Sequence, residues 1–355
     1  MAENHNVTIS VIVPIYNTAR YLPAFLHSLA EQEPGPYDAE YIFIDDQSID
    51  DSVPVLRRWL QCEGRQSGIS GQSRVVELPC NQGASHARNV GLDLATADFV
   101  SMPDSDDYLT RSYYRSAATL AVDLPEDCSI IDCPVFFWNG DDFNHSTAPR
   151  PDKYTRGNGI VDLYTTPTSF KSHAASALFR RKHIQDAGIR FRETVNASED
   201  ALFCCDVLLS REIPYIAVSI DSRYYYRQRE SDDGMSTQGL SHPEWIIETI
   251  EHGFLEILGQ FFDDCPPQWL AESLLYYYKF LLRSLQQSRA AWSKAQIQEL
   301  SLCMRKTLQF FTEDQIRAFS SSSLSHAACE ALLGLRSPSR QEVITAVDPA
   351  SEASK

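Results

Sequence analysis

The first 110 residues alternate short apolar runs with segments whose apolar residues recur every three or four positions. Each apolar run ends in polar residues, and the four runs are residues 7–14, 40–44, 74–78 and 97–102. Runs of this kind predict strands that are buried on both faces. The periodic segments predict amphipathic helices over residues 21–32, 50–60 and 83–97. Alternating strands and helices predict an α/β fold with a doubly wound, mostly parallel sheet flanked by helices.

Beyond residue 110 the pattern is less regular. The further expected elements are a helix over 112–122, strands over 130–138, 177–181, 215–218 and 224–229, and loops over 63–73 and 139–159. A helix is expected to start at Ser198. From Pro243 to about Leu335 apolar spacings of three and four predict helices alone, and residues 337–355 predict a disordered tail.

These patterns predict three regions along the chain. The first is an α/β domain over residues 1–236, with halves at 7–110 and 111–236, and it is followed by an all-α region over 237–336 and the tail. The apolar faces of the all-α region suggest packing on the first domain, dimerisation or placement of an acceptor.

Composition and charge restrict the classes of partner. The chain has 355 residues, of which 43% are hydrophobic, so it can bury a large core. A net charge of -17 argues against nucleic acid and anionic membranes as partners. No run reaches the roughly 18 apolar residues of a membrane span, and the N-terminus does not resemble a signal peptide. We therefore expect a cytoplasmic protein, for which peripheral association with the membrane through a partner stays open.

The nine cysteines show no disulfide framework. Their number is odd, two of them are adjacent at Cys204-Cys205, and no Cys-x-x-Cys pair occurs. Zinc binding and thioredoxin-like chemistry are therefore not expected, and reduced thiols fit a cytoplasmic setting.

The acidic cluster Asp104-Ser105-Asp106-Asp107 directly follows the fourth apolar run. Ligands of open α/β sheets gather outside the carboxyl ends of strands. An Asp-x-Asp at that edge offers hard oxygen ligands to Mg²⁺ or Mn²⁺ and leaves positions for substrate phosphates. An Asp-Ser-Asp turn that caps a following helix explains the same residues. The cluster alone does not decide between these interpretations.

The order of five stretches resembles the family-2 inverting glycosyltransferases, which have the Rossmann-like GT-A fold. The stretches are residues 11–17, 44–48, 82–92, 104–107 and 199–200, so the likeness covers about residues 7–230. The sequence departs from the family at Gln47, where glycine is usual, and at Met102-Pro103, where a larger apolar pair is usual. The change at Gln47 affects the turn that carries Asp46.

The resemblance implies a nucleotide-sugar donor, most simply a UDP-sugar. The residues implied to contact it are Pro14, Tyr16, Asp46, Arg88, Asp104, Ser105, Arg227 and Arg229. The Tyr16 ring is suited to stacking on a base, although core packing is the commoner role. Asp46 would accept a hydrogen bond from a uracil imide or cap the following helix. Arg88 would bind phosphate or tether a carboxylate of the acidic cluster, unless it is an ordinary surface arginine.

The remaining implied roles are those of the metal ligands, the catalytic carboxylates and a closing loop. Asp106 would bind Mn²⁺ or Mg²⁺ directly, and Asp104 would be shared between metal, water and ribose. Asp107 would have a structural role or support the metal ligands from behind. Asp200 would be the base that deprotonates the acceptor hydroxyl, with Glu199 orienting it or contacting the acceptor. Helix capping by Ser198 explains the same segment and is compatible with that role.

Arg227 and Arg229 resemble a loop that closes over the donor in some relatives, where their charge would lie beside the diphosphate. His86, His173 and His242 receive no role.

The expected function is therefore metal-dependent, inverting sugar transfer from a nucleotide diphosphate to a hydroxyl of a glycan or lipid-linked glycan, in cell-surface polysaccharide synthesis. Two alternatives are a nucleotidyltransferase, which would want a Gly-rich loop after the first strand, and a catalytically inactive nucleotide-sugar scaffold or sensor. A homo-oligomer formed through the C-terminal helices stays open.

Overall fold

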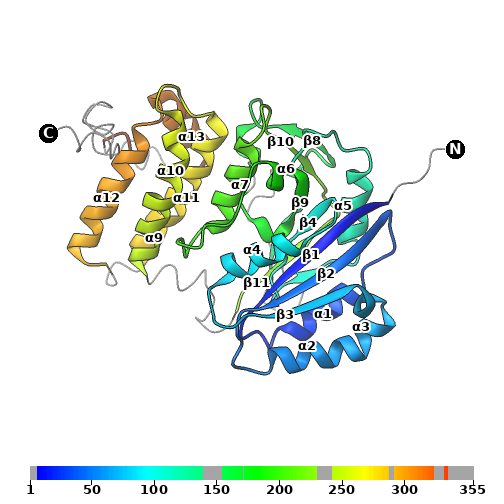
Figure 1. Ribbon diagram of the computed structural model, residues 1–355. Coiled ribbons are helices and arrows are strands. Elements are labelled where there is room, and N and C mark those ends of the chain that lie inside the picture. The colour runs from blue at the N-terminus through cyan, green and yellow to red at the C-terminus, as the bar shows by residue number, and fades with distance from the viewer. Residues whose placement is uncertain are drawn as a thin grey trace. The chain divides into compact units, whose positions relative to one another are not determined.

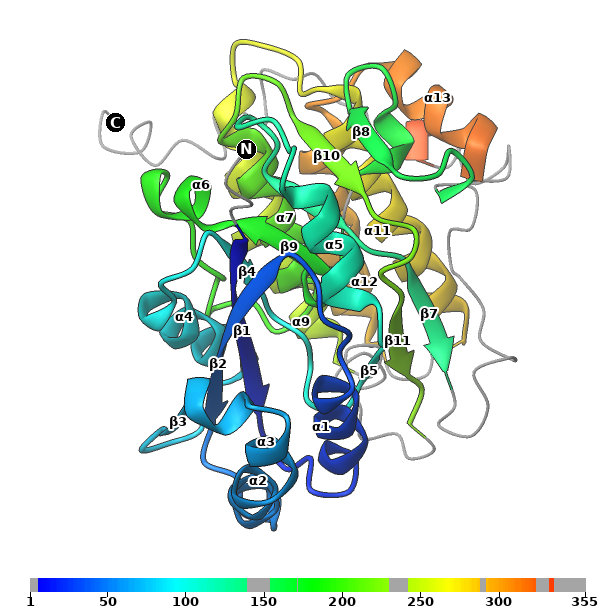
Figure 2. The ribbon, with the colours of Figure 1, turned by 90° about the vertical axis from the view of Figure 1, so that its right-hand side faces the viewer.

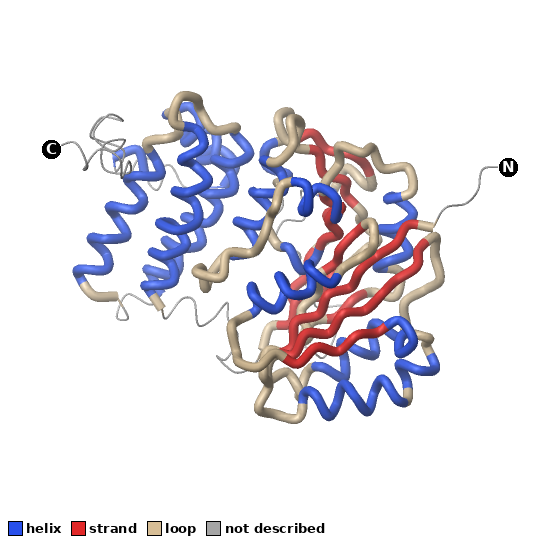
Figure 3. Tube along the Cα trace, viewed as in Figure 1, coloured by secondary structure: helices blue, strands red, loops and turns tan. Residues whose placement is uncertain are grey.

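The chain divides into two units. The computed structural model describes residues 6–138, 154–170, 172–229, 242–287, 292–323 and 332–334. The first unit consists of Met1–Glu193 with Phe203–Glu230, and the second of Thr194–Leu202 with Ser231–Lys355. Among the described residues every strand lies in the first unit, and the second is built from helices (Figure 1, Figure 3). The expected all-α C-terminal region is thus confirmed. The predicted tail lies outside the described residues.

An eight-stranded, mostly parallel sheet forms the centre of the first unit. The strands of this unit are β1 (Val7–Ile15), β2 (Tyr37–Asp45), β3 (Ser73–Glu77), β4 (Phe99–Ser101), β5 (Tyr108–Leu109), β6 (Ile130–Asp132), β7 (Val135–Trp138), β8 (Gly159–Asp162), β9 (Ala177–Arg180), β10 (Tyr215–Val218) and β11 (Tyr224–Arg227). The large sheet has the order β3-β2-β1-β4-β9-β6-β10-β8. β3, β2, β1 and β4 are parallel neighbours, so their carboxyl ends share one edge. The predicted α/β class is confirmed.

The segment predicted as one strand over residues 130–138 is two strands in two sheets. β6 pairs with β9 and β10 in the large sheet, whereas β7 pairs with β11 in a three-stranded sheet of order β5-β11-β7. Cys133 and Pro134 separate them, and Pro134 has no N–H to continue a ladder. The carbonyl of Pro134 instead accepts from the Tyr224 N–H at 2.8 Å. The expectation of one strand was wrong because a continuous apolar run does not reveal a change of sheet.

Helices cover both faces of the large sheet (Figure 2). Those of the first unit and at its boundary are α1 (Leu22–Ala30), α2 (Ser52–Gln61), α3 (Glu63–Gln66), η1 (Ile69–Gln72), α4 (Ala84–Leu94), α5 (Tyr113–Ala121), η4 (Pro167–Ser169), η5 (Ala174–Ser176), α6 (Arg181–Asp186) and α7 (Glu199–Leu209). Alternate residues of β1 separate the faces. Val11 joins Phe25 and Tyr113 in the core shared with α1 and α5. Ile12 packs under α4, where a Cβ on Gly91 would lie 2.1 Å from its Cγ2.

Residues 63–73, expected to be a loop, contain the short helices α3 and η1. Gly64 lies against the Trp59 ring, and a Cβ there would be 2.9 Å from it. Ile69 is also buried. A glycine and one isoleucine anchor this segment, which is too few apolar residues for a periodic pattern to show in the sequence.

The second unit contains only helices among its described residues. Beyond the start of α7 these are α9 (Pro243–Thr249), η6 (Ile250–Phe254), α10 (Leu255–Leu258), η7 (Gly259–Phe261), α11 (Gln268–Gln287), α12 (Lys294–Leu308) and α13 (Glu313–Ser323). Ser293 caps α12 in a capping box with Gln296. None of the helices in the described ranges combines the length and apolar character needed to cross a bilayer.

Buried His183 in α6 is expected to make folding stability depend on pH. Its Nδ1 lies 2.8 Å from the Ser129 hydroxyl. Burial, together with Arg211 and Arg180, lowers the pKa of His183 to about 4. The unfolded chain therefore takes up this proton first as the pH falls below about 6.5. We expect the free energy of unfolding to fall by up to about 3 kcal/mol between roughly pH 6.5 and pH 4, and then to level off.

Urea denaturation of the wild type and of His183→Gln across this pH range measures the effect. The variant has no imidazole to protonate, so it should lose less stability over the window. Parallel curves for the two proteins would contradict this assignment.

Candidate active site

The acidic cluster lies at the carboxyl end of β4, between that strand and β5. Arg88, on α4, donates from Nη2 to Asp104 Oδ1 at 2.8 Å. Its side chain is only 4% exposed, and its guanidinium lies 5.2 Å from the centre of the Phe191 ring. Arg88 is therefore not a surface arginine. Of the roles considered for it, tethering a carboxylate of the cluster is the one that the geometry displays.

Two arginines at the end of β11 reach the same cluster. Arg229 donates to Asp106 Oδ2 from Nε at 2.9 Å, and its Nη2 lies 2.8 Å from the same oxygen. Arg227 donates from Nε to the Asp106 carbonyl at 2.7 Å, with its guanidinium 4.1 Å from the Trp138 ring centre. The guanidinium of Arg229 lies 5.0 Å from the Tyr21 ring centre. The predicted residues Arg88, Asp104, Asp106, Arg227 and Arg229 thus come together in the first unit.

Asp107 connects the acidic cluster to β11. It is fully buried, and it accepts from the Tyr224 hydroxyl at 2.5 Å and from the Arg227 N–H at 2.7 Å. The Tyr224 oxygen also accepts from the Asp104 N–H at 3.1 Å. Burial, and then the neighbouring Asp106 and Asp104, raise the pKa of Asp107 well above its usual value. Asp107 holds in place the backbone that carries Asp104, Asp106 and Arg227.

Replacing Asp107 with alanine is expected to lower the free energy of unfolding by about 2–4 kcal/mol, because two buried donors lose their acceptor. Asp107→Asn is the matched control. It retains one carbonyl oxygen, so only one of the two buried donors loses its acceptor, and the loss should be about 1–2 kcal/mol. Urea denaturation measures both variants. Equal losses in the two variants would contradict the assignment of the stability to the two accepted hydrogen bonds.

The other predicted donor contacts lie at the carboxyl ends of β1 and β2. Tyr16 follows β1 and is 46% exposed, so core packing is the wrong interpretation of this residue. Pro14 is partly exposed within β1. Ser105 is buried, with its hydroxyl 3.1 Å from that of Thr18. Ser105 therefore ties the acidic cluster to the loop after β1.

Asp46 holds the loop that precedes α4. Its two oxygens accept from the Gln82 and Gly83 N–H groups at 2.9 and 2.7 Å, and only 2% of the residue is exposed. Burial raises the pKa of Asp46. Its contact with a nucleotide base stays a prediction, whereas its structural role is visible.

Gln47, where the family usually has glycine, adopts the left-handed conformation with φ of 62°. The turn is therefore retained without glycine. The Gln47 amide donates to the Pro79 carbonyl at 3.1 Å and its oxygen accepts from the Asn81 N–H at 3.3 Å. These contacts offset part of the strain expected of a non-glycine residue at positive φ.

Glu199 and Asp200 lie in the second unit, in the first turn of α7, and both are partly exposed. The Ser198 carbonyl accepts from the Ala201 and Leu202 N–H groups at 3.0 and 3.2 Å. The helix therefore begins where the sequence predicts. The joint action of these two carboxylates with the acidic cluster stays a prediction.

Three aromatic residues of the cluster were missed by sequence reasoning. Tyr224 binds Asp107, while Trp138 and Tyr21 lie against Arg227. The run Tyr224-Tyr225-Tyr226 directly before Arg227 was a possible signal, but a sequence does not show which ring faces the acidic cluster.

The acidic cluster offers carboxylate oxygens to a divalent cation, but not a complete set of protein ligands. Within the described residues no three His, Cys, Asp or Glu side chains form a metal-binding group. Asp104 and Asp106 alone offer a partial oxygen set, which suits Mg²⁺ or Mn²⁺ when phosphates and water complete the shell. Arg229 contacts the Asp106 carboxylate twice, and both contacts are made to Oδ2, so neither of them involves Oδ1.

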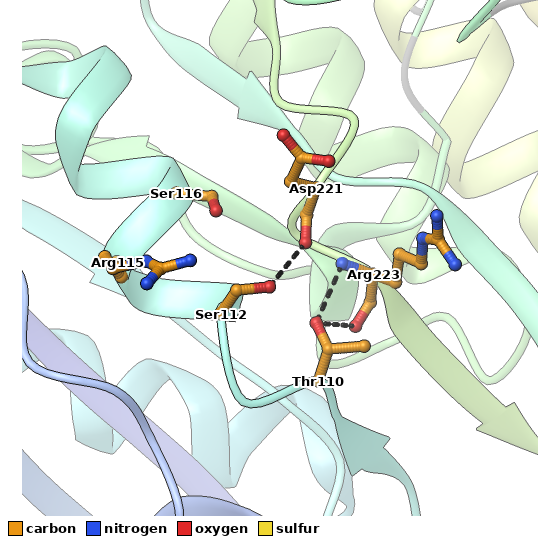
Figure 4. A pocket seen from close by; sticks show the side chains of 6 residues that line it. All are labelled: Thr110, Ser112, Arg115, Ser116, Asp221 and Arg223. Carbon is orange, nitrogen blue, oxygen red and sulfur yellow. Dashed lines mark hydrogen bonds between the residues drawn. The ribbon is translucent and has the colours of Figure 1, made fainter.

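A separate pocket lies at the other end of β5 and β11 (Figure 4). It is lined by Thr110, Ser112, Arg115, Ser116, Asp221 and Arg223. The Ser112 hydroxyl donates to the Asp221 carbonyl at 3.0 Å, and Thr110 exchanges hydrogen bonds with the Arg223 backbone. Arg115 pairs with Glu33 at 2.6 Å. These groups fasten the start of α5 to the chain before β11, and no predicted site residue lies here.

Several known proteins have sequences similar to this one, among them one from Bacillus subtilis and one from Staphylococcus aureus. "Minor teichoic acid biosynthesis protein GgaA" of Bacillus subtilis is 27% identical over 77% of this chain and 59% of its own length. "Poly(ribitol-phosphate) beta-N-acetylglucosaminyltransferase TarS" of Staphylococcus aureus is 28% identical over 76% of this chain and 44% of its own. The chain spans about half the length of the curated relatives it matches.

The fold also has a counterpart among solved structures. The crystal structure of S. aureus TarS 1-349 in complex with UDP-GlcNAc matches with a TM-score of 0.69 and 22% identity, over 93% of this chain and 89% of that one. This likeness supports the GT-A assignment of the sheet and its helices. The model of the family described as "Glycosyl transferase family 2" matches residues 10–188, about half of the chain. The chain belongs to glycosyl transferase family 2.

Proposed function

We propose that this chain is a metal-dependent, inverting glycosyltransferase that moves a sugar from a UDP-sugar to a hydroxyl of a cell-surface glycopolymer. The observation that carries the proposal is the cluster at the end of β4, where Asp104 and Asp106 are each held by an arginine from another element. Paired carboxylates surrounded by arginines provide both a cation site and positive charge for a diphosphate.

The first unit binds the donor in this proposal. Tyr16, exposed after β1, stacks on the base. Arg227 and Arg229, which both contact Asp106, donate to the diphosphate in this proposal. Asp106 and Asp104 would hold Mn²⁺ or Mg²⁺, which supplies charge neutralisation for the leaving diphosphate.

Asp200 is the general base that deprotonates the acceptor hydroxyl in this proposal. The acceptor oxygen forms a bond to the anomeric carbon on the face opposite the leaving group, while the bond from that carbon to the diphosphate oxygen breaks. The proton of the acceptor hydroxyl passes to the Asp200 carboxylate, and UDP leaves with the electron pair of the broken bond. Attack from the opposite face inverts the anomeric configuration. Glu199 orients Asp200 or contacts the acceptor.

Relatives suggest the classes of donor and acceptor. TarS carries an N-acetylglucosaminyltransferase name and its structure was solved with UDP-GlcNAc, while its named polymer is poly(ribitol-phosphate). We therefore propose an N-acetylhexosamine or hexose as the sugar, and a polyol-phosphate polymer as the acceptor. Because the chain carries a net charge of -17, local arginines rather than the overall field must hold an anionic polymer.

Thermal unfolding with UDP tests the donor site. Ligand at 100 times its dissociation constant stabilises a protein by about 2.7 kcal/mol, which is about 4 °C for a chain of 355 residues. We expect such a shift with UDP and Mn²⁺ together, a smaller one with UDP alone, and none with AMP. No shift with UDP and metal in the wild type would refute the donor site.

A further inference from the structure

A strained turn immediately precedes the two carboxylates of α7. Ser198 has φ of 59°, in the left-handed region that residues other than glycine rarely occupy. Such a conformation costs about 1–3 kcal/mol and persists only where its surroundings impose it. The residues that surround this turn in the second unit therefore decide where Glu199 and Asp200 point.

Thr249, the last residue of α9, holds the turn through its side chain. Its hydroxyl oxygen is fully buried and lies 2.7 Å from the Ala197 carbonyl and 2.8 Å from the Trp245 carbonyl. The hydroxyl has a single proton, so it donates to one of these two carbonyls at a time. The distance to the Ala197 carbonyl is the shorter of the two. Thr249 thus links the helical region to the residue before the strained turn.

Gly253 brings the next helical segment against α7. It lies in the π-helical turn η6, and a Cβ at this position would lie 2.5 Å from Leu202 Cδ1. Leu202 belongs to the first turn of α7, as do Glu199 and Asp200. π-Helical turns are rare and occur often at functional sites. The helical region therefore contacts the start of α7 at two separate points, one before the carboxylates and one after them.

We propose that the helical region positions the catalytic base, and that Thr249 and Gly253 are its positioning residues. This inference rests on the proposed function, in which Asp200 takes the proton of the acceptor. Thr249 fixes the entry to α7, and Gly253 permits the close packing that fixes its first turn. A misplacement of about 1 Å in such a group can lower turnover 10²-fold, so these distant contacts act on the rate rather than on donor binding.

The test compares Thr249→Val with Thr249→Ser. Valine preserves the shape of the side chain but removes the hydroxyl, whereas serine retains it. Thr307→Val is the matched control, because Thr307 is also fully buried in this unit and its hydroxyl donates to the Met304 carbonyl at 2.9 Å. Two quantities are measured: amide hydrogen exchange over residues 194–202, and the rate of UDP release from UDP-GlcNAc with poly(ribitol-phosphate).

For Thr249→Val we expect exchange at Ala201 and Leu202 to accelerate about 10-fold and kcat to fall about 10- to 100-fold, with UDP affinity unchanged. Thr249→Ser should restore both values, and Thr307→Val should change neither, even if it melts at a lower temperature. Gly253→Ala should lower kcat in the same way, because Leu202 must move.

Two results would overturn the inference. Unchanged exchange in Thr249→Val would refute the holding contact, and accelerated exchange with unchanged kcat would refute the positioning role. Full turnover by Asp200→Asn would instead refute the proposed function, and the exchange measurement would still report on the contact itself.

Discussion

Asp200→Asn is expected to lower kcat by about 10²–10⁴-fold while leaving UDP affinity within about twofold, since general-base catalysis contributes that much to a reaction rate. Asparagine has nearly the same shape as aspartate but has no carboxylate to accept the proton of the acceptor. The residues of the proposed donor site lie in the first unit and are unchanged in this variant. Initial rates of UDP release and calorimetric titration with UDP separate the two effects.

Glu199→Gln is the matched control for this prediction. It makes the same chemical change one residue earlier in the same helical turn. If Glu199 only orients its neighbour, its loss should be smaller than that of Asp200→Asn by about 10-fold or more. The reverse order would assign the base to Glu199. Activity of Asp200→Asn within threefold of wild type would place the base elsewhere.

Arg88→Ala is expected to weaken UDP binding about 100-fold in the presence of Mn²⁺ and to lower the free energy of unfolding by about 1–3 kcal/mol. The change leaves Asp104, whose side chain is 26% exposed, without its arginine and beside two further carboxylates. It also removes the guanidinium from the Phe191 ring. Both the orientation of Asp104 and the packing beneath the cluster are then lost.

The matched control removes an exposed arginine that is also paired with a carboxylate. Arg57 forms an ion pair with Glu77, and the two side chains are 60% and 46% exposed. Exposed pairs contribute about 0–1 kcal/mol, so Arg57→Ala should unfold like wild type and bind UDP normally. If Arg88→Ala behaved in the same way, the buried pair would have no part in the donor site. Urea denaturation and titration with UDP provide both readouts.

The first four strands and their helices could be predicted because each strand is buried on both faces and each helix on one. Such burial produces patterns that a sequence displays directly. The division of residues 130–138 between two sheets could not be predicted from the sequence, because both parts of the segment are apolar. The helices within residues 63–73 also escaped prediction, since their packing depends on Gly64 against Trp59.

Some features of the candidate site could likewise be predicted from the sequence, and others could not. Asp104 and Asp106 follow a strand, so their place at the sheet edge could be inferred from local sequence. The partner of Asp106 could not be inferred from local sequence, because Arg229 lies 123 residues further along the chain. Two-residue strand β5 pairs with β11 and brings them together, and it is too short to leave a pattern. Ser105 and Asp46 show the converse, since their observed contacts are structural.

The measurement that tests the central claim most directly is the anomeric configuration of the product. Wild-type protein is incubated with Mn²⁺, poly(ribitol-phosphate) and, in turn, the α-linked donors UDP-GlcNAc, UDP-GalNAc and UDP-glucose. UDP release reports turnover, and proton NMR of the polymer reports the new linkage. We predict acceptor-dependent release with one donor, a β-linked product, and loss of both with Asp200→Asn. An α-linked product, or no acceptor-dependent release from any donor that binds, would contradict the account.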